Sequence, residues 1–247
     1  MKLFKKVKLL LTQVIFLLGY RIERLKNGER DFDRTFGKNE NLDLSVLLRE
    51  RNHPIIFDIG ANTGQSIDRF RSLFPDAKIY SFEPDKVTFE TLRENHSGDG
   101  LYSFEIALGD KLGKANLYLN SSKDMNSLLR SENPQWGQNE GECEVVVSTV
   151  DKFCLENEIK YIDLLKTDTQ GFELQVLKGC SRMMREKRIN LVTMEVIFSN
   201  MHEGISPFDE VYRFMLDNGF RLVSFYEFYH LNQLANWADA LFSRVDS

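Results

Sequence analysis

The sequence contains few of the residues that mark non-globular chains, with five prolines and fifteen glycines among 247 residues. That composition excludes a collagen-like or low-complexity protein. The sequence also lacks an excess of positive charge, since 32 lysines and arginines stand against 37 aspartates and glutamates. Without a basic field to neutralise phosphates, we expect no nucleic-acid partner. With 42% hydrophobic residues, the chain is predicted to be globular, with one large or two small domains.

Cysteine is scarce as well. Cys143, Cys154 and Cys180 are odd in number, and their spacing matches neither a disulfide framework nor a zinc site. We therefore expect three packing residues in a reducing compartment, which predicts a cytoplasmic protein.

The apolar run over residues 9–20 is shorter than the roughly 20 residues that span a bilayer. Lysines precede it, and Tyr-Arg-Ile-Glu-Arg follows it in place of a small-residue cleavage site, which excludes a secretion signal. Residues 1–26 are instead predicted to form a basic amphipathic helix. Such a helix packs on its own protein, packs on a second subunit of a homo-oligomer, or docks peripherally on an anionic membrane.

Short apolar runs alternate with helical patterns from residue 54 onward. Strands are expected over 55–59, 78–82, 102–108, 115–119, 143–150, 162–167, 189–196, 220–225 and 240–245. Helices are expected over 64–73, 85–95, 172–186 and 207–218. This alternation predicts an α/β fold with a mostly parallel sheet covered on both faces. The polar stretch 120–142 is long for a connection and is predicted to be a lid or a binding element.

The sharpest local signal is a hydrophobic strand that ends in an acid and passes through a turn with two glycines into a helix. Asp58 precedes the turn, Gly60 permits its tight backbone, and Gly64 permits close approach of the backbone to a ligand. Glu83 ends the second predicted strand, where Rossmann-type sites place an acid against ribose hydroxyls. These residues are expected to converge on one nucleotide-type site.

The identity of the nucleotide follows from a departure in the turn. The dinucleotide motif G-x-G-x-x-G requires a second glycine where this chain has Asn62, which weakens the case for NAD or FAD. Asp58 would repel a pyrophosphate but suits a ligand with an ammonium group. S-adenosylmethionine carries such a group together with ribose hydroxyls, so it is the predicted cofactor.

Four blocks of the sequence occur in an order typical of one family. They are Asp58–Gly64, Phe82–Pro84, Ala107–Asp110 and Leu165–Glu173. Over about residues 54–245, the chain resembles the FkbM family of S-adenosylmethionine-dependent methyltransferases. The resemblance implies a Rossmann-like class I methyltransferase fold with a seven-stranded, mostly parallel sheet. It assigns residues 51–247 to the methyltransferase domain and leaves residues 1–50 as an N-terminal helical extension.

Carried over by position, the resemblance implies roles for individual residues. Gly60, Asn62 and Gly64 would line the methionine end of the cofactor, Glu83 would hold the ribose, and Ala107 would flank the adenine. The acceptor would be a hydroxyl, and we expect it on a carbohydrate or glycan.

The fourth block departs from the family pattern. Thr167, Thr169 and Gln170 replace the usual Ile, Val and Glu, and Gln170 cannot serve as a carboxylate base. Gln170 is therefore assigned to acceptor binding. Lys166 and Glu173, at the two ends of this block, are expected to pair with each other.

Removal of the acceptor's proton needs a base, and three residues near the predicted strand ends are candidates. Asp168 ranks first, and the resemblance implies that it also binds the cofactor, beside the transferable methyl group. Glu195, at the end of the strand over 189–196, ranks second. His202, whose ordinary pKa suits a base near neutrality, ranks third. Two carboxylates are a poor metal signature, so we expect no metal.

Two peripheral features could contact the acceptor. Ser127 and Trp136 lie on the long polar stretch and are predicted to bind it, because hydroxyl and aromatic groups suit sugar rings. The aromatic run 225–229 follows a predicted strand and is interpreted mainly as core.

Two alternatives stay open at this stage. An NAD-dependent nucleotide-sugar oxidoreductase would share the fold, but Tyr161 is followed four residues later by Leu165 and not by the lysine of a Tyr-x-x-x-Lys pair. A non-catalytic, membrane-peripheral binding module would keep the fold without turnover, and the glutamine at position 170 leaves room for it.

Overall fold

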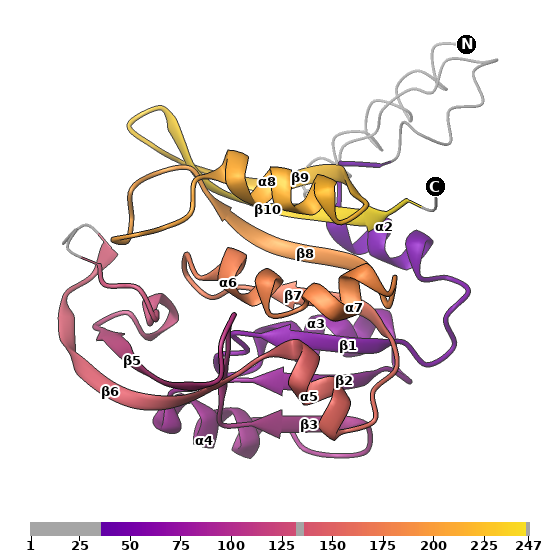
Figure 1. The fold of residues 1–247 in the computed structure, drawn as a ribbon, viewed down its shortest axis with the longest axis horizontal. Helices are drawn as coiled ribbons and strands as arrows, with labels where there is room; N and C mark the ends of the chain where they lie inside the picture. Colours follow the sequence, from indigo (N-terminus) through magenta and orange to yellow (C-terminus); the bar gives the residue numbers. More distant parts are fainter. Residues whose placement is uncertain (1–35, 132–135, 246–247) are drawn as a thin grey trace, which may run out of the picture. The chain divides into compact units, whose positions relative to one another are not determined.

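A seven-stranded sheet organises the part of the chain that the computed structural model describes, residues 36–131 and 136–245 (Figure 1). Its strand order is β3-β2-β1-β7-β8-β10-β9. The strands are β1 (Ile55–Ile59), β2 (Lys78–Phe82), β3 (Leu101–Phe104), β7 (Ile162–Thr167), β8 (Ile189–Ile197), β9 (Phe220–Leu231) and β10 (Leu234–Arg244). The predicted α/β fold with a mostly parallel seven-stranded sheet is confirmed.

The pairing of β1 creates the position of the site. β1 pairs in parallel with both β2 and β7, and β7 pairs in parallel with β8. The chain moves from β1 to β2 on one side and reaches β7 only later on the other, so the strand order reverses beside β1. In open α/β sheets, ligands bind outside the carboxyl ends of the strands at such a reversal. Only β10 runs antiparallel to its neighbours, β8 and β9.

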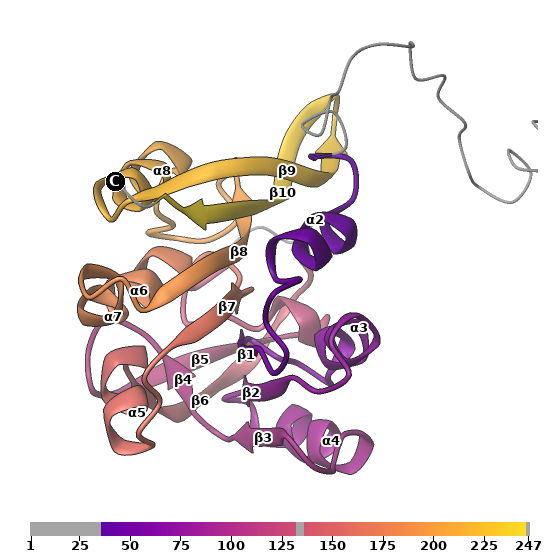
Figure 2. The ribbon, with the colours of Figure 1, turned by 90° about the vertical axis from the view of Figure 1, so that its right-hand side faces the viewer.

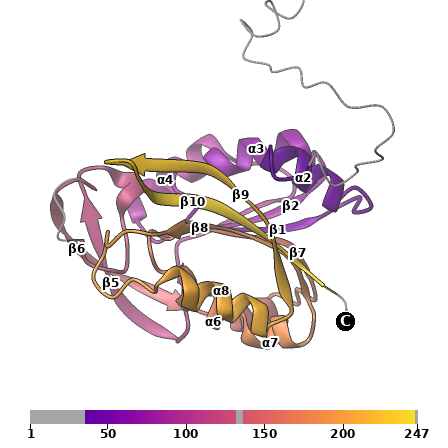
Figure 3. The ribbon, with the colours of Figure 1, turned by 90° about the horizontal axis from the view of Figure 1, so that it is seen from above.

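Helices cover both faces of the sheet (Figures 2 and 3). The helices on one face are α2 (Glu40–Leu47), α3 (Gln65–Leu73) and α4 (Lys86–Asn95). Those on the other are α5 (Val150–Glu156), α6 (Glu173–Lys178), α7 (Ser181–Arg185) and α8 (Phe208–Asp217). Asn39, Asp85 and Thr149 cap the first turns of α2, α4 and α5 by accepting main-chain N–H groups.

Helix α2 belongs to the region expected to be an extension. Leu44 and Leu48 are almost completely buried and pack in the same cluster as Ile56 of β1. The described part of the chain falls in one compact unit, Thr35–Ser247. The division into domains at residue 50 stays a prediction, and the amphipathic helix expected over residues 1–26 lies outside the described residues.

A second, smaller sheet has the order β4-β6-β5 and was not foreseen as a separate unit. Its strands are β4 (Ala107–Leu108), β5 (Gly113–Asn120) and β6 (Asn139–Ser148), and the short 3-10 helix η2 (Lys123–Met125) follows β5. The single helix expected over 172–186 is wrong, because Gly179 and Cys180 separate α6 from α7. A Cβ at Gly179 would lie 2.1 Å from the carbonyl oxygen of Gly109, so the backbones meet too closely for a side chain.

The last two strands are longer than the sequence pattern predicted. β9 continues to Leu231, so the run 225–229 lies within the strand and not after it. Asn232 and Gln233, both with positive φ, close the hairpin to β10. Among the described helices, none is long and apolar enough to cross a membrane.

Candidate active site

A cavity of about 510 Å³ opens at the carboxyl ends of β1, β2, β7 and β8. The loop after β1, the residues after β2 and the segment 123–128 contribute its walls. The predicted site residues that line it are Gly60, Asn62, Glu83, Ala107, Ser127, Asp168, Gln170 and Glu195. The topology therefore brings together residues that lie far apart in the sequence.

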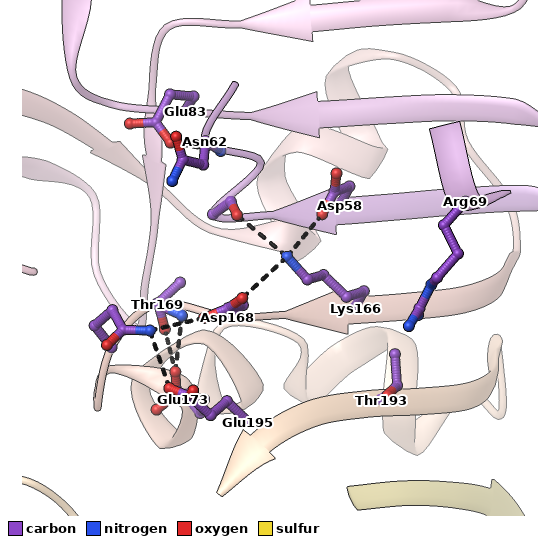
Figure 4. Close-up of polar contacts among 12 residues, drawn as sticks. Asp58, Asn62, Arg69, Glu83, Lys166, Asp168, Thr169, Glu173, Thr193 and Glu195 are labelled. Atoms are coloured by element: carbon purple, nitrogen blue, oxygen red, sulfur yellow. Dashed lines mark hydrogen bonds and ion pairs between the residues drawn. The ribbon is translucent and has the colours of Figure 1, made fainter. Parts of the chain in front are cut away.

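Glu83 lies at one end of this cavity, beside Asn62 (Figure 4). One carboxylate oxygen accepts the main-chain N–H of Asn62 and the other accepts that of Asp85, each at 2.9 Å. Burial raises the pKa of Glu83 to about 7, although these two hydrogen bonds oppose the shift. The carboxylate is thus held in one orientation before any ligand binds.

Gly60 sets the floor of the cavity. Its φ is +77°, and a Cβ here would lie 1.9 Å from the carbonyl oxygen of Asp168. The main-chain N–H of Asp168 in turn donates to the oxygen of Ile59 at 3.0 Å. Only glycine permits this contact, which brings the loop after β1 against the end of β7.

Lys166 also lines the cavity, although the sequence analysis did not predict it as a site residue. Its Nζ lies 3.1 Å from Asp58 Oδ1 and 3.5 Å from Asp168 Oδ2, and it donates to the carbonyl oxygen of Gly60 at 3.2 Å (Figure 4). The expected pair with Glu173 is wrong, because the Glu173 carboxylate instead accepts from the main chain and hydroxyl of Thr169. Lys166 lies directly across from Asp58 in the register of β7 and β1.

Asp58 does not line the cavity. Its side chain is fully buried beneath the cavity floor, and Lys166 neutralises it. Burial raises the pKa of Asp58, and the positive charge of Lys166 opposes that shift. For Lys166, burial alone would lower the pKa, but the negative charges of Asp58 and Asp168 outweigh it and raise the pKa. Asp58 therefore fixes Lys166, and Lys166 presents the charge to the cavity.

A Lys166→Met variant is expected to lose about 3–5 kcal/mol of stability, because it leaves the Asp58 charge buried without a partner. Urea denaturation of the purified protein measures this loss. The matched control is Lys152→Met on α5, whose exposed pair with Glu156 contributes at most about 1 kcal/mol. Equal losses in the two variants would show that the buried pair is not a structural requirement.

Gln170 connects the two candidate bases. Its φ is +53°, and its single amide nitrogen donates to Asp168 Oδ1 and to Glu195 Oε2, both at 3.0 Å (Figure 4). Burial raises the pKa of Glu195 well above its usual value, and the negative charges of Asp168 and Glu173 add to the shift. A glutamate at position 170 would place a third carboxylate here, whereas the amide satisfies both acids.

Ser127 holds the segment 123–128 in place over the cavity. Its hydroxyl donates to the carbonyl oxygen of Gln170 at 2.8 Å and accepts the N–H of Leu129 at 3.0 Å. Main-chain hydrogen bonds between Tyr118 and Ser127 fasten the same segment to β5. The hydroxyl is therefore engaged within the protein, and its direct effect is on the shape of the cavity.

Besides Asp58, three further predicted site residues do not line the cavity. A Cβ at Gly64, whose φ is +102°, would lie 2.2 Å from the ring of His96, so this glycine packs against the residue that follows α4. His202 lines a separate small hollow beside Asn120, and burial lowers its pKa. The Trp136 ring packs against Trp237, which does line the cavity, with ring centres 5.2 Å apart.

A polar annex of about 120 Å³ adjoins the main cavity and shares Lys166, Asp168 and Glu195 with it. The annex is also lined by three charged residues that the sequence analysis missed: Glu40 of α2, Arg69 of α3 and Asp239 of β10. Arg69 pairs with Glu40 at 2.8 Å, and the Thr193 hydroxyl donates to Glu40. Within the described residues, no three His, Cys, Asp or Glu side chains form a group that could hold a metal ion.

The buried acids predict how stability depends on pH. Burial, as the largest cause, raises the pKa of Glu83, Glu173 and Asp239 to about 7, from 4.5 for the glutamates and 3.8 for the aspartate. Each acid binds a proton more tightly in the folded state, so the unfolded state binds fewer protons and stability falls as pH rises towards 7. The urea midpoint of the ligand-free protein is expected to be lower at about pH 8 than at about pH 5.5. A midpoint that rises over this interval would contradict the assignment.

The strand order, and the cavity at the reversal beside β1, define a Rossmann-like class I methyltransferase fold. The sequence profile described as "Methyltransferase FkbM domain" matches residues 58–222. The chain belongs to the FkbM methyltransferase family. It is an S-adenosylmethionine-dependent methyltransferase, as the sequence analysis predicted, and an oxidoreductase is set aside.

Two relatives and one solved structure illustrate the similarity. The 2-O-methyltransferase NoeI of Sinorhizobium fredii is 29% identical over 174 residues, covering 66% of this chain and 71% of NoeI. The hexuronic acid methyltransferase AglP of Haloferax volcanii is 26% identical over 194 residues, covering 77% of this chain and 69% of AglP. The magnesium protoporphyrin IX methyltransferase ChlM of Synechocystis gives a TM-score of 0.48 at 10% identity, covering 89% of this chain and 87% of ChlM.

Proposed function

We propose that the protein is an O-methyltransferase whose acceptor is a hydroxyl group of a carbohydrate. The observation that carries the proposal is a single cavity that is lined by Glu83, by the Lys166–Asp168 pair and by the carboxylate of Glu195. The names of two relatives, a 2-O-methyltransferase and a hexuronic acid methyltransferase, support an oxygen on a sugar as the methylated atom.

The Glu83 end fits the nucleoside part of the cofactor. Each Glu83 oxygen is already oriented by one main-chain N–H, and its remaining lone pair can accept a ribose hydroxyl. Ala107 and its neighbour Ile106, which also line the cavity, would flank the adenine. When bound, S-adenosylmethionine supplies a methyl group already activated by a sulfonium.

The floor of the cavity fits the amino-acid part of the cofactor. The backbone from Gly60 to Asn62 borders the cavity without a side chain at its tightest point. The methionine end carries an ammonium and a carboxylate, and the cavity offers the Asp168 carboxylate and the Lys166 ammonium close to each other. Asp58 acts indirectly, because it holds Lys166.

The acceptor end requires a group that removes the hydroxyl proton, and we assign that role to Glu195. Burial and its acidic neighbours make this carboxylate a stronger base than an ordinary glutamate. The amide of Gln170 holds one Glu195 oxygen, which fixes the side chain without neutralising it by a cation. Asp168, which lies near Lys166, is better suited to orient the cofactor and the acceptor.

The test uses labelled S-adenosylmethionine and a glycan extract from cells of the source organism that lack this protein, so that acceptor hydroxyls are unmethylated. The wild-type enzyme is expected to place label on sugar oxygens, and Glu195→Gln is expected to slow that labelling by about 10²–10⁴-fold. Label that enters lipid or protein fractions but no carbohydrate would overturn the choice of acceptor. Labelling by Glu195→Gln at the wild-type rate would overturn the choice of base.

A further inference from the structure

Three aromatic rings lie next to one another where the main cavity, lined by Tyr229 and Trp237, meets the exposed surface of Tyr229. Tyr229 of β9 stacks on Trp237 of β10 with ring centres 4.7 Å apart and planes 14° apart. Trp136 packs edge-on against Trp237, with ring centres 5.2 Å apart. We call these three residues the aromatic row.

The aromatic row belongs to the acceptor end of the cavity. Tyr229 and Trp237 line the cavity together with Glu195. Trp237 precedes Asp239 by two residues on β10, and Asp239 pairs with Glu195 in the register of β10 and β8. Two residues of a strand span about 6.6 Å, so the row borders the proposed base and not the Glu83 end.

Packing within the described chain covers only part of the Tyr229 ring. Tyr229 is 54% exposed although Trp237 stacks on it. An exposed flat aromatic ring beside polar groups suits a sugar, which has apolar C–H faces and a rim of hydroxyls.

The size of the cavity adds a second argument. A volume of about 510 Å³ is what a single drug-sized ligand requires, and the cofactor is itself of that size. With the cofactor bound, little of this volume is left for an oligosaccharide, so we expect its second ring to reach the exposed side of Tyr229.

On the basis of the proposed function, we propose that the acceptor is an oligosaccharide and that a sugar ring next to the methylated one stacks on the exposed ring of Tyr229, which itself stacks on Trp237. This subsite lies beyond residue 222, where the match to the family profile ends. The subsite is formed by the hairpin of β9 and β10. It would favour acceptors with two or more sugar rings, whatever the identity of the methylated ring.

The chain offers a matched control on the same hairpin. Phe228 is exposed to a similar degree, at 46%, but it does not line the cavity. It packs instead with Phe198, their rings nearly parallel and 6.1 Å apart. A Phe228→Ala change removes a neighbouring exposed aromatic ring without touching the aromatic row.

The experiment separates the glycan extract described above by size and measures methyl transfer to each fraction. Label is expected in fractions of two or more rings. Tyr229→Ala is expected to raise KM for these fractions about tenfold with little change in kcat, while Tyr229→Phe and Phe228→Ala stay within about twofold of wild type. Affinity for S-adenosylmethionine, measured by calorimetry, is expected to be unchanged in all three variants.

A second readout does not depend on turnover. The only two tryptophans of the chain, Trp136 and Trp237, both belong to the aromatic row, so tryptophan fluorescence reports on it directly. The unmethylated oligosaccharide fraction that serves as acceptor is expected to change the tryptophan emission of the wild-type protein loaded with S-adenosylhomocysteine. In Tyr229→Ala, about tenfold more of that fraction is expected to be needed for the same change.

The outcomes distinguish this inference from the proposed function. Label confined to monosaccharides, or a Tyr229→Ala variant with wild-type KM, would overturn the stacking subsite and leave sugar O-methylation in place. Cofactor binding without label in any carbohydrate fraction would overturn the proposed acceptor and the subsite with it.

Discussion

A Glu195→Gln variant is expected to lose about 10²–10⁴-fold in kcat while it binds S-adenosylmethionine with wild-type affinity. The replacement keeps the size of the side chain, and its carbonyl oxygen can still accept from the amide of Gln170. What it removes is the capacity to take up a proton. Steady-state kinetics with the labelled acceptor fraction measures kcat, and calorimetry measures the cofactor affinity separately.

The matched comparison is Asp168→Asn, since both acids accept from the same Gln170 nitrogen. We expect Asp168→Asn to weaken binding of the cofactor more than it lowers kcat, because Asp168 lies 3.5 Å from Lys166 at the cofactor end. If instead Asp168→Asn abolishes turnover and Glu195→Gln preserves it, the two roles are exchanged.

The pH dependence of kcat provides a further check on Glu195. A general base acts only when it is deprotonated, so kcat is expected to rise with pH through the elevated pKa of Glu195. The residual activity of Glu195→Gln is expected to lack this rise. A rise that survives in the variant would show that another group controls it.

The fold was predictable because its signals are local. Residues 55–59 form a nearly continuous apolar run, as expected for a strand buried on both faces. The observed strand β1 has the predicted bounds, Ile55–Ile59. The prediction was wrong where long-range contacts overrode the local pattern. Nothing in the helical periodicity of 172–186 indicates that Gly179 meets the backbone of Gly109 and divides the helix.

The candidate site was predictable where a motif marks a strand end. Glu83 and Gly60 lie in the cavity because the sheet brings the carboxyl ends of β1 and β2 together. Lys166 was missed because its partner depends on strand register: Asp58 lies opposite it across β1 and β7, more than one hundred residues away in the chain. The annex was missed for a similar reason, since Glu40 and Asp239 come from near the two ends of the described chain.

A Glu83→Ala variant is expected to weaken binding of S-adenosylmethionine by at least about 100-fold. Two hydrogen bonds from ribose hydroxyls to a carboxylate contribute about 1.5–3 kcal/mol each, and the main-chain N–H groups of Asn62 and Asp85 lose their acceptor as well. Calorimetry with S-adenosylhomocysteine provides the measurement without turnover. The control is Glu90→Ala, an exposed acid on α4, which is expected to bind as wild type does. Equal affinities in the two variants would show that Glu83 does not bind the ribose.

The elevated pKa of Glu83 makes the same assignment testable through pH. At pH values below about 7 the carboxyl becomes protonated, and a neutral carboxyl is a weaker acceptor for ribose hydroxyls. The affinity of wild type for S-adenosylhomocysteine is therefore expected to fall by up to tenfold per pH unit below about 7. Glu83→Gln, which cannot ionise, is expected to bind S-adenosylhomocysteine weakly and with no dependence on pH in this range. Asp239→Asn removes another acid with a pKa of about 7, and its affinity is expected to depend on pH as that of wild type does. A slope that disappears in Asp239→Asn and persists in Glu83→Gln would place the titrating group in the annex and not at the ribose.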